Sequence, residues 1–162
     1  MNDTLSLSAA GLAFIAAWED FRASVYRDAA GIPTIGYGHR LAMDEPDPGA
    51  MTRDAALSLL KQDVATAEAA VRRTIAAALT QAEFDALVSL AFNIGGGAFG
   101  GSTLAARLNA GDFLGAAREF LAWDKIRVAG ALTVSPGLSR RRAAERDLFL
   151  HADYAGARSL SA

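Results

Sequence analysis

The stretch WEDFRASVYRDAAGIPTIGYGH, residues 18–39, marks a change from a helical pattern to an extended one. Before it, Ser8 can cap a helix of mostly apolar residues that runs to about Phe21 or Arg22. Within it, glycine and β-branched residues become frequent, and the segment DAAG at 28–31 is typical of a turn between two short strands. The sequence therefore predicts a small β element directly after the first helix.

Helical patterns account for most of the chain outside this stretch. After a polar loop, Thr52 can cap a long helix that reaches about Ala78. The segment TQAE at 80–83 is a capping box, and it opens a helix that the glycines at 95–97 end. Shorter helices are expected at about 102–109, 112–123 and 137–151, with a looser stretch at 125–135.

These elements predict an α+β fold in one domain that covers residues 1–162. A small lobe with a short β-hairpin or sheet spans about 12–50, and a mainly helical lobe spans about 80–152. The long helix at about 52–78 is expected to join the two lobes.

Composition excludes several kinds of site. The 162 residues are 52% hydrophobic and 21% charged, which suits a compact domain with its own core. The absence of cysteine excludes zinc–thiolate sites, a thiol nucleophile and disulfides. The two histidines, His39 and His151, lie far apart, so we expect neither a metal site nor a cofactor. A net charge of −2 argues against nucleic acid as a partner. Carboxylates, hydroxyls and arginines remain to carry chemistry.

Glu19 stands out because it lies on the apolar face of the first helix. Leu12, Ile15 and Ala16 form a stripe at helical spacing, and Glu19 continues that stripe at the helix end. Desolvation at the edge of a core raises the pKa of a carboxyl group, which suits a general acid that must keep its proton near neutral pH. The alternative is a solvated glutamate, or one paired with a nearby arginine.

Asp28 and Thr34 flank the predicted turn, so the hairpin can bring them together. A glycosidase needs one protonated and one ionised carboxyl group on either side of the scissile bond. Considered alone, Asp28 is equally consistent with a turn residue that binds its own backbone, and Thr34 with an ordinary strand residue.

Two ordered blocks of sequence resemble the phage-type lysozymes, glycoside hydrolase family 24. The second block lies in the C-terminal half, and together the blocks cover about residues 12–150. They are Trp18-Glu19, Tyr26-Arg27-Asp28, Gly31 and Thr34 to His39, then Ala91 to Gly95, Ser102 to Leu104, Leu108 to Gly111, Trp123 and Gly137 to Glu145. Asp20 departs from the pattern, because many members carry glycine there, and we expect it to alter local packing rather than chemistry.

The resemblance implies a lysozyme-like fold and assigns a role to each of the three residues. Glu19 looks like the general acid that protonates the glycosidic oxygen. Asp28 is similar to the carboxylate that holds or activates the attacking water, or that acts by electrostatics alone, and Thr34 to the hydroxyl that helps to place that water. An inverting attack is implied, for which the Glu19 and Asp28 carboxyl groups should lie roughly 6.5–9.5 Å apart.

The last predicted helix carries three consecutive arginines, Arg140, Arg141 and Arg142. Such a run is often a solvated face. An arginine that enters the cleft could instead orient Glu19 or bind carboxylates of the substrate's peptides. Of the three we expect Arg142, rather than Arg141, to take this place.

Four further residues are assigned from the same patterns. Asn93 is expected to be a cleft amide that binds N-acetyl or peptide groups, and Gly38 and Ser102 to line the cleft. His39 is interpreted as structural, with Asp63 as its ionic partner.

The function that the resemblance implies is an endolysin, a muramidase that cleaves the β-1,4 bond between N-acetylmuramic acid and N-acetylglucosamine in peptidoglycan. A lytic transglycosylase and a non-catalytic peptidoglycan-binding module remain as alternatives. The N-terminal residues show neither a secretory signal nor a membrane anchor. We therefore expect a monomer that stays in the host cytoplasm until a holin-type lesion releases it to the cell wall.

Overall fold

The computed structural model describes residues 2–156, and it begins with the helix that the sequence predicts. Helix α1 (Ala9–Trp18) is capped by Ser8, whose side chain accepts a hydrogen bond from the Gly11 backbone N–H. The helix ends before the predicted Phe21 or Arg22, because Glu19 already adopts an extended backbone conformation. The chain then enters the sheet, so Glu19 lies at the junction between helix and sheet.

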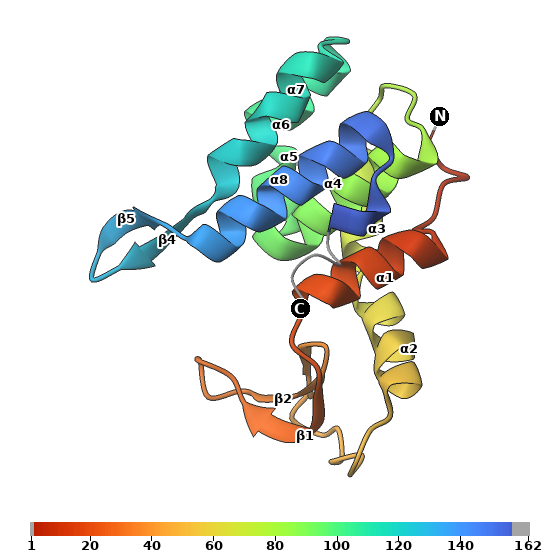
Figure 1. The fold of residues 1–162 in the computed structure, drawn as a ribbon. Coiled ribbons are helices and arrows are strands. Elements are labelled where there is room, and N and C mark those ends of the chain that lie inside the picture. The colour runs from red at the N-terminus through yellow and green to blue at the C-terminus, as the bar shows by residue number, and fades with distance from the viewer. Residues whose placement is uncertain (1, 157–162) are drawn as a thin grey trace.

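The predicted β element is a three-stranded antiparallel sheet, which we call the sheet lobe. Its strands are β1 (Arg22–Arg27), β2 (Pro33–Gly36) and β3 (His39–Arg40), in the order β1-β2-β3. Tyr26 on β1 lies opposite Thr34 on β2, which fixes the register beside the turn. The sheet lobe lies beside α2, away from the helices that follow α3 (Figure 1).

The predicted long connecting helix is two helices, α2 (Arg53–Asp63) and α3 (Ala65–Thr74), with a break at Val64. The expected end at Ala78 is also wrong, because Ile75 is extended. Asparagine side chains from distant segments occupy the backbone groups that a longer helix would use. Asn2 donates to the carbonyl oxygens of Ile75 and Ala77 at 2.9 Å.

The helical lobe is built around α4 (Gln81–Ile94), which begins with the predicted capping box and ends at Gly95, where φ is +88°. Figure 1 shows α8 (Pro136–His151) lying across this helix. The other elements of the lobe are α5 (Gly96–Gly100), α6 (Thr103–Asn109), α7 (Phe113–Glu119) and the 3₁₀ helix η1 (Phe120–Trp123). Fully buried side chains between these elements form the core; they include Phe84, Leu87, Leu90, Phe99, Leu104, Leu108, Phe120 and Leu148.

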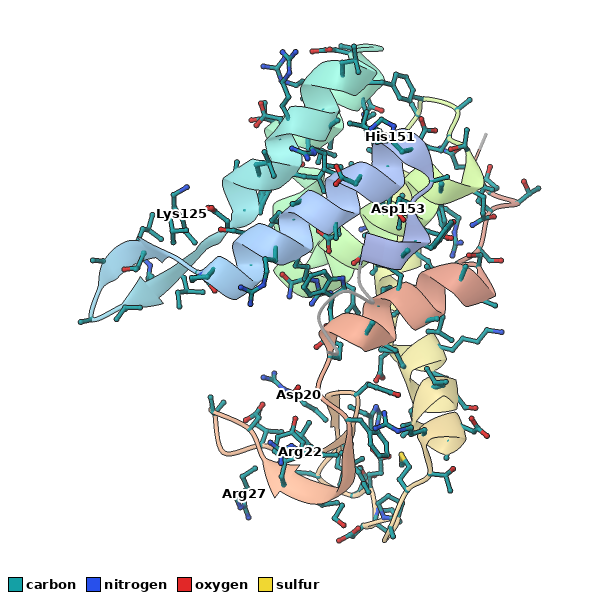
Figure 2. The ribbon with its side chains drawn as sticks, viewed as in Figure 1. Asp20, Arg22, Arg27, Lys125, His151 and Asp153 are labelled. Atoms are coloured by element: carbon teal, nitrogen blue, oxygen red, sulfur yellow. The ribbon has the colours of Figure 1, made fainter. Side chains whose placement is uncertain are left out.

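The stretch predicted to be loose, 125–135, contains a β-hairpin of β4 (Lys125–Val128) and β5 (Ala131–Val134). Ala129 and Gly130 both have positive φ, as a tight two-residue hairpin turn requires. The hairpin projects from the helical lobe, and Figure 2 shows Lys125 near its base. Polar and apolar residues alternate in β4, from Lys125 to Val128, but all the strand residues of the hairpin are exposed, so neither face packs on the core.

The helices of residues 2–156 include none that combines the length and apolar character needed to span a membrane. The arrangement as a whole is the α+β architecture that the sequence predicts.

Candidate active site

Glu19 occupies the position that ends α1, and its side chain contacts the last helix. Arg141 on α8 donates from Nη1 to Glu19 Oε1 at 2.8 Å. The Glu19 side chain is 25% exposed, whereas that of Arg141 is only 5% exposed. The paired-arginine alternative for Glu19 is therefore the arrangement that the structure shows.

The expectation that Arg142 enters the cleft is wrong. Its side chain is completely buried, and it pairs with Glu145, donating from Nη2 to Oε1 at 3.0 Å with its Nε 2.9 Å from Oε2. Consecutive residues of an α-helix point about 100° apart, so only one of two neighbouring arginines can face α1. Arg141 takes that place, and Arg142 has no exposed surface with which to bind a substrate.

Glu145 is the residue of this cluster that the sequence reasoning missed. It is fully buried, and its Oε1 accepts hydrogen bonds from Arg141 Nε at 3.1 Å and from Ser89 Oγ at 2.7 Å, besides that from Arg142. Burial raises the pKa of Glu145, against the opposing effect of the two guanidinium groups. Its spacing of three and four residues from the two arginines is the signal that could have revealed it.

Asp28 sits in the turn after β1 with both carboxylate oxygens engaged. Oδ1 accepts from the backbone N–H groups of Ala30 at 2.8 Å and Ile32 at 2.9 Å, and Oδ2 pairs with Arg40 at 2.8 Å. The Ile32 hydrogen bond is the largest influence on the pKa of Asp28; with Ala30 and Arg40 it outweighs partial burial and lowers that pKa. Asp28 is therefore an ionised carboxylate, and its side chain keeps 16% of its surface exposed.

Thr34 and Asp28 are both hydrogen-bonded to the backbone of Ile32. Its buried hydroxyl donates to the Ile32 carbonyl oxygen at 2.9 Å, while the Ile32 N–H donates to Asp28. The structure thus brings Asp28 and Thr34 together around one residue. Because the hydroxyl proton is used, Thr34 Oγ1 is left with acceptor capacity only.

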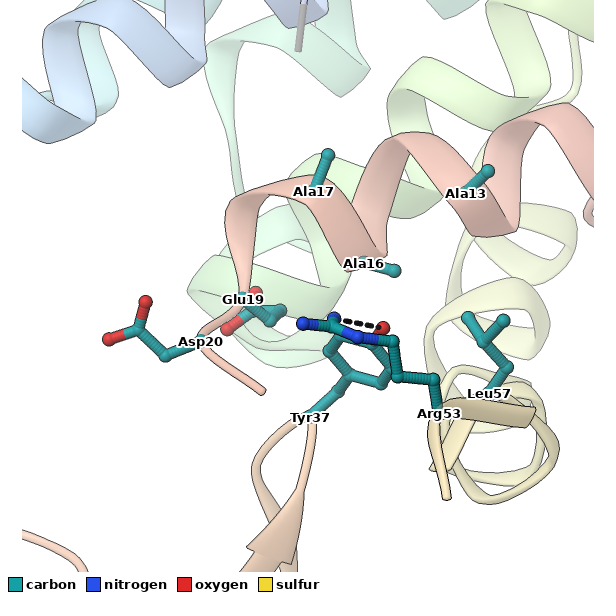
Figure 3. A pocket seen from close by; sticks show the side chains of 8 residues that line it. All are labelled: Ala13, Ala16, Ala17, Glu19, Asp20, Tyr37, Arg53 and Leu57. Carbon is teal, nitrogen blue, oxygen red and sulfur yellow. Dashed lines mark hydrogen bonds between the residues drawn. The ribbon is translucent and has the colours of Figure 1, made fainter. Parts of the chain in front are cut away.

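Glu19 also lines a cavity of about 470 Å³ between the end of α1, the turn after β2 and the start of α2 (Figure 3). Asp28 and Thr34 are not among the residues that line it. Arg53 reaches this cavity from the start of α2, with its guanidinium 4.5 Å from the Phe21 ring centre and its Nη1 3.5 Å from the Tyr37 hydroxyl. The lining residues are Ala13, Ala16, Ala17, Glu19, Asp20, Tyr37, Arg53 and Leu57.

The end of α1 borders a second hollow, of about 390 Å³, on the side of α8. Ala17 and Trp18 contribute from α1, and Arg140 and Arg141 from α8. Ala17 lines both hollows, and arginines line each of them: Arg53 the first, and Arg140 and Arg141 the second.

The remaining predicted residues lie in different places. Ser102 does not line the cleft as expected. Its largely buried hydroxyl caps α6, accepting from the Ala105 N–H and donating to the Phe99 carbonyl oxygen at 2.7 Å. Gly38, with φ +90°, and Asn93 are both exposed, and their role in substrate binding stays a prediction.

The predicted ionic pair of His39 is confirmed. His39 Nδ1 lies 2.9 Å from Asp63 Oδ1, and its Nε2 lies 3.3 Å from Glu45 Oε1. Over residues 2–156, no group of three or more His, Asp or Glu side chains is arranged to hold a metal ion.

Comparison with known proteins shows which family this chain matches. The phage lysozyme family model matches residues 16–145, which include α1's end, the sheet lobe and the arginines of α8. The chain belongs to the phage lysozyme family. It is a lysozyme enzyme of the endolysin type, and the predicted lysozyme-like fold is confirmed.

The relatives match nearly the whole length of this lysozyme. The endolysin of Acyrthosiphon pisum secondary endosymbiont phage 1 is 41% identical over 145 residues, which are 90% of this chain and 98% of the relative. Among solved structures, the endolysin from Escherichia coli O157:H7 phage FAHEc1 has a TM-score of 0.85 at 40% identity, covering 93% of this chain and 97% of its own. A point mutant of the P22 lysozyme has a TM-score of 0.80 at 35% identity, covering 91% of this chain and 99% of its own.

Proposed function

We propose that this lysozyme hydrolyses the β-1,4 bond between N-acetylmuramic acid and N-acetylglucosamine in peptidoglycan, with inversion at the anomeric carbon. The observation that carries the proposal is the contrast between two carboxyl groups. Glu19 is hydrogen-bonded at the end of α1 by one arginine, and Asp28 is fixed as an ionised acceptor beside a hydroxyl. Two carboxyl groups with separate environments are what glycoside hydrolysis requires.

In the proposed reaction Glu19 donates its proton to the glycosidic oxygen as the bond from that oxygen to the anomeric carbon breaks. Water attacks the anomeric carbon from the opposite face and forms the new bond. Asp28 accepts the proton that the water loses, and Thr34 Oγ1, which has only acceptor capacity left, accepts a hydrogen bond from the same water. Exchange with solvent then restores the proton on Glu19.

Arg141 acts against the protonated state that Glu19 needs, because a guanidinium favours the ionised carboxylate. A glycan that covers Glu19 removes water from it, and this desolvation favours the neutral acid.

The decisive experiment is the clearing of permeabilised Gram-negative cells by the wild type, by Glu19→Gln and by Glu119→Gln as a matched control. Glu119 lies at the end of α7, where it pairs with the exposed Arg107 of α6, and it does not line the cavity that Glu19 lines. The Glu119→Gln variant should therefore clear cells as the wild type does. We expect Glu19→Gln to abolish clearing. Equal clearing by all three would favour a non-catalytic peptidoglycan-binding module.

Product analysis separates the remaining alternatives. Hydrolysis adds water and leaves a reducing end, whereas a lytic transglycosylase leaves an anhydro-muramyl end of lower mass. The endolysin and lysozyme relatives favour hydrolysis. Proton NMR of the first product formed should show the α-anomer for an inverting enzyme, and an initial β-anomer would indicate retention.

We further propose that the enzyme acts as a monomer and reaches the cell wall from the host cytoplasm through a holin-type lesion. Expression in the host cytoplasm should leave cells intact until a membrane-permeabilising agent is added, and lysis should then follow at once. Lysis without that agent would contradict the proposed route, and a dimer mass in light scattering would contradict the monomer.

A further inference from the structure

We propose that Glu145 is a positioning residue that controls how strongly Arg141 holds the Glu19 carboxylate. The inference rests on the proposed function, because it concerns the group that is to deliver the proton. Glu145 touches neither Glu19 nor the surface, and it acts through the one guanidinium that contacts both carboxylates.

The geometry is a chain of contacts that runs inward from the site. Arg141 donates from Nη1 to Glu19 and from Nε to Glu145, so one rigid, planar guanidinium bridges the two acids. Ser89 on α4 holds the far side of the chain, at 2.7 Å from Glu145 Oε1. Any change in the charge or reach of Glu145 must therefore be transmitted to the bond between Arg141 and Glu19.

The charges of this cluster alternate and cancel. Glu19 and Glu145 are the acids, and Arg141 and Arg142 are the bases, with three of the four side chains at most 5% exposed. From the elements packed around the cluster, α4 presents the uncharged Ser89, and the end of α1 adds only the exposed Asp20 beyond Glu19. Arg53 of α2 lines the cavity that Glu19 also lines.

Charge–charge interactions within such a buried cluster are weakly screened. Glu145 competes with Glu19 for Arg141 and repels its negative charge, so it favours the protonated form of Glu19. Arg142 is linked to Glu19 through Glu145 and has the opposite sign. The two residues should therefore shift the titration of Glu19 in opposite directions.

This opposition gives a test that does not depend on activity. The protonation of Glu19 is followed by carbon-13 NMR of labelled glutamate carboxyl groups, with the Glu19 signal identified by its absence in Glu19→Gln. We expect Glu145→Gln to lower the pH at which Glu19 loses its proton, because a negative charge is lost from a buried neighbour. Arg142→Met should raise it, and the double variant should lie between the two.

The pH profile of peptidoglycan clearing should follow the titration. In Glu145→Gln the alkaline limb should move to lower pH, so that much of the activity lost at neutral pH returns in acid; in Arg142→Met it should move to higher pH. A merely structural role would reduce activity at every pH and would not give shifts of opposite sign. Titrations that coincide with the wild type, or shifts of the same sign, would overturn the proposal.

Glu145→Asp covers the case in which an uncompensated buried charge prevents folding. It keeps the charge but shortens the reach, so Arg141 should move toward Glu19 and lower its pKa by less than Glu145→Gln does. An unchanged Glu19 titration in a folded Glu145→Asp protein would also overturn the proposal. If Glu19→Gln retained activity, the proposed function would fail, whatever the titrations showed.

Discussion

The two carboxyl groups of the site are held in different ways. Glu19 accepts its hydrogen bond from Arg141, a residue 122 positions away in the sequence and on another helix. Asp28 is held from within the sheet lobe, by Ala30, Ile32 and Arg40. The environment of Asp28 is therefore set within the sheet lobe, whereas the hydrogen bond of Glu19 depends on how α1 and α8 pack.

The cations that hold the two acids differ in the same way. The Arg40 side chain is 61% exposed, so solvent screens its pair with Asp28. Arg141 and Arg142 are buried against Glu145, where a charge that loses its partner is not stabilised by water. The helical lobe should thus be sensitive to substitution of its ion pairs, and the sheet lobe tolerant.

The largest expected effect is a loss of catalytic rate, and it follows from a substitution in the sheet lobe. Asp28→Asn keeps an oxygen that can accept from Ala30 and Ile32, so stability should change by less than about 1 kcal/mol. Loss of the negative charge should lower the rate of peptidoglycan hydrolysis about 10²–10⁴-fold, the usual contribution of a general base. Clearing assays and thermal unfolding measure the two effects.

Asp47→Asn is the matched control for Asp28→Asn. Asp47 accepts from the N–H two residues ahead, Gly49, at 2.8 Å, as Asp28 does from Ala30. Its variant should retain full activity. A comparable loss of activity in both variants would mean that turn structure, rather than the charge of Asp28, matters.

The next effect is on stability and compares the two lobes directly. Arg142→Met leaves Glu145 buried without its closest counter-charge and should lower the free energy of unfolding by about 3–5 kcal/mol. Arg40→Met removes an exposed partner and should cost less than about 1 kcal/mol. Denaturant unfolding followed by circular dichroism measures both. Equal losses would show that the buried cluster is not the more vulnerable one.

The same contrast explains which features the sequence could predict. The Ser8 cap, the capping box at 80–83 and the turn at Asp28 are local, and each formed as predicted because its partners lie within a few residues. The pair of His39 and Asp63 joins distant segments and was also predicted correctly.

Other features that depend on tertiary contacts were missed. The choice between Arg141 and Arg142 depends on the rotation of α8 against α1, which the run of three arginines does not specify. The connecting helix ends early because Asn2 supplies hydrogen bonds from the N-terminus. The β4–β5 hairpin packs neither face on the core, and the short alternation of polar and apolar residues at 125–128 was not interpreted as a strand.

A smaller effect tests a close backbone contact between the sheet lobe and α2. Gly36 has φ +67°, and a Cβ added there would lie 3.1 Å from Ala56 Cβ. Gly36→Ala should therefore cost about 2–3 kcal/mol, from backbone strain and crowding together. Gly31→Ala is the control, because φ is +78° but the space is open, so only the strain of about 1–2 kcal/mol remains. Equal losses would mean that contact with α2 adds nothing to the stability of the sheet lobe.

The smallest effect concerns the ion pair that joins the sheet lobe to α2. Partial burial lowers the pKa of His39, but the carboxylates of Asp63 and Glu45 outweigh it, so that pKa lies above its usual value. A group whose pKa is raised by folding stabilises the protein fully below its unfolded pKa, about 6.5, and this stabilisation is lost as pH rises through the folded pKa. Asp63→Asn should therefore lower stability by up to about 1 kcal/mol at pH 5.5 and much less at pH 9. Asp54→Asn, on the same helix, is the control and should change the free energy of unfolding equally at both pH values. A pH-independent loss in Asp63→Asn would show that the pair stabilises the junction through neutral hydrogen bonding rather than charge.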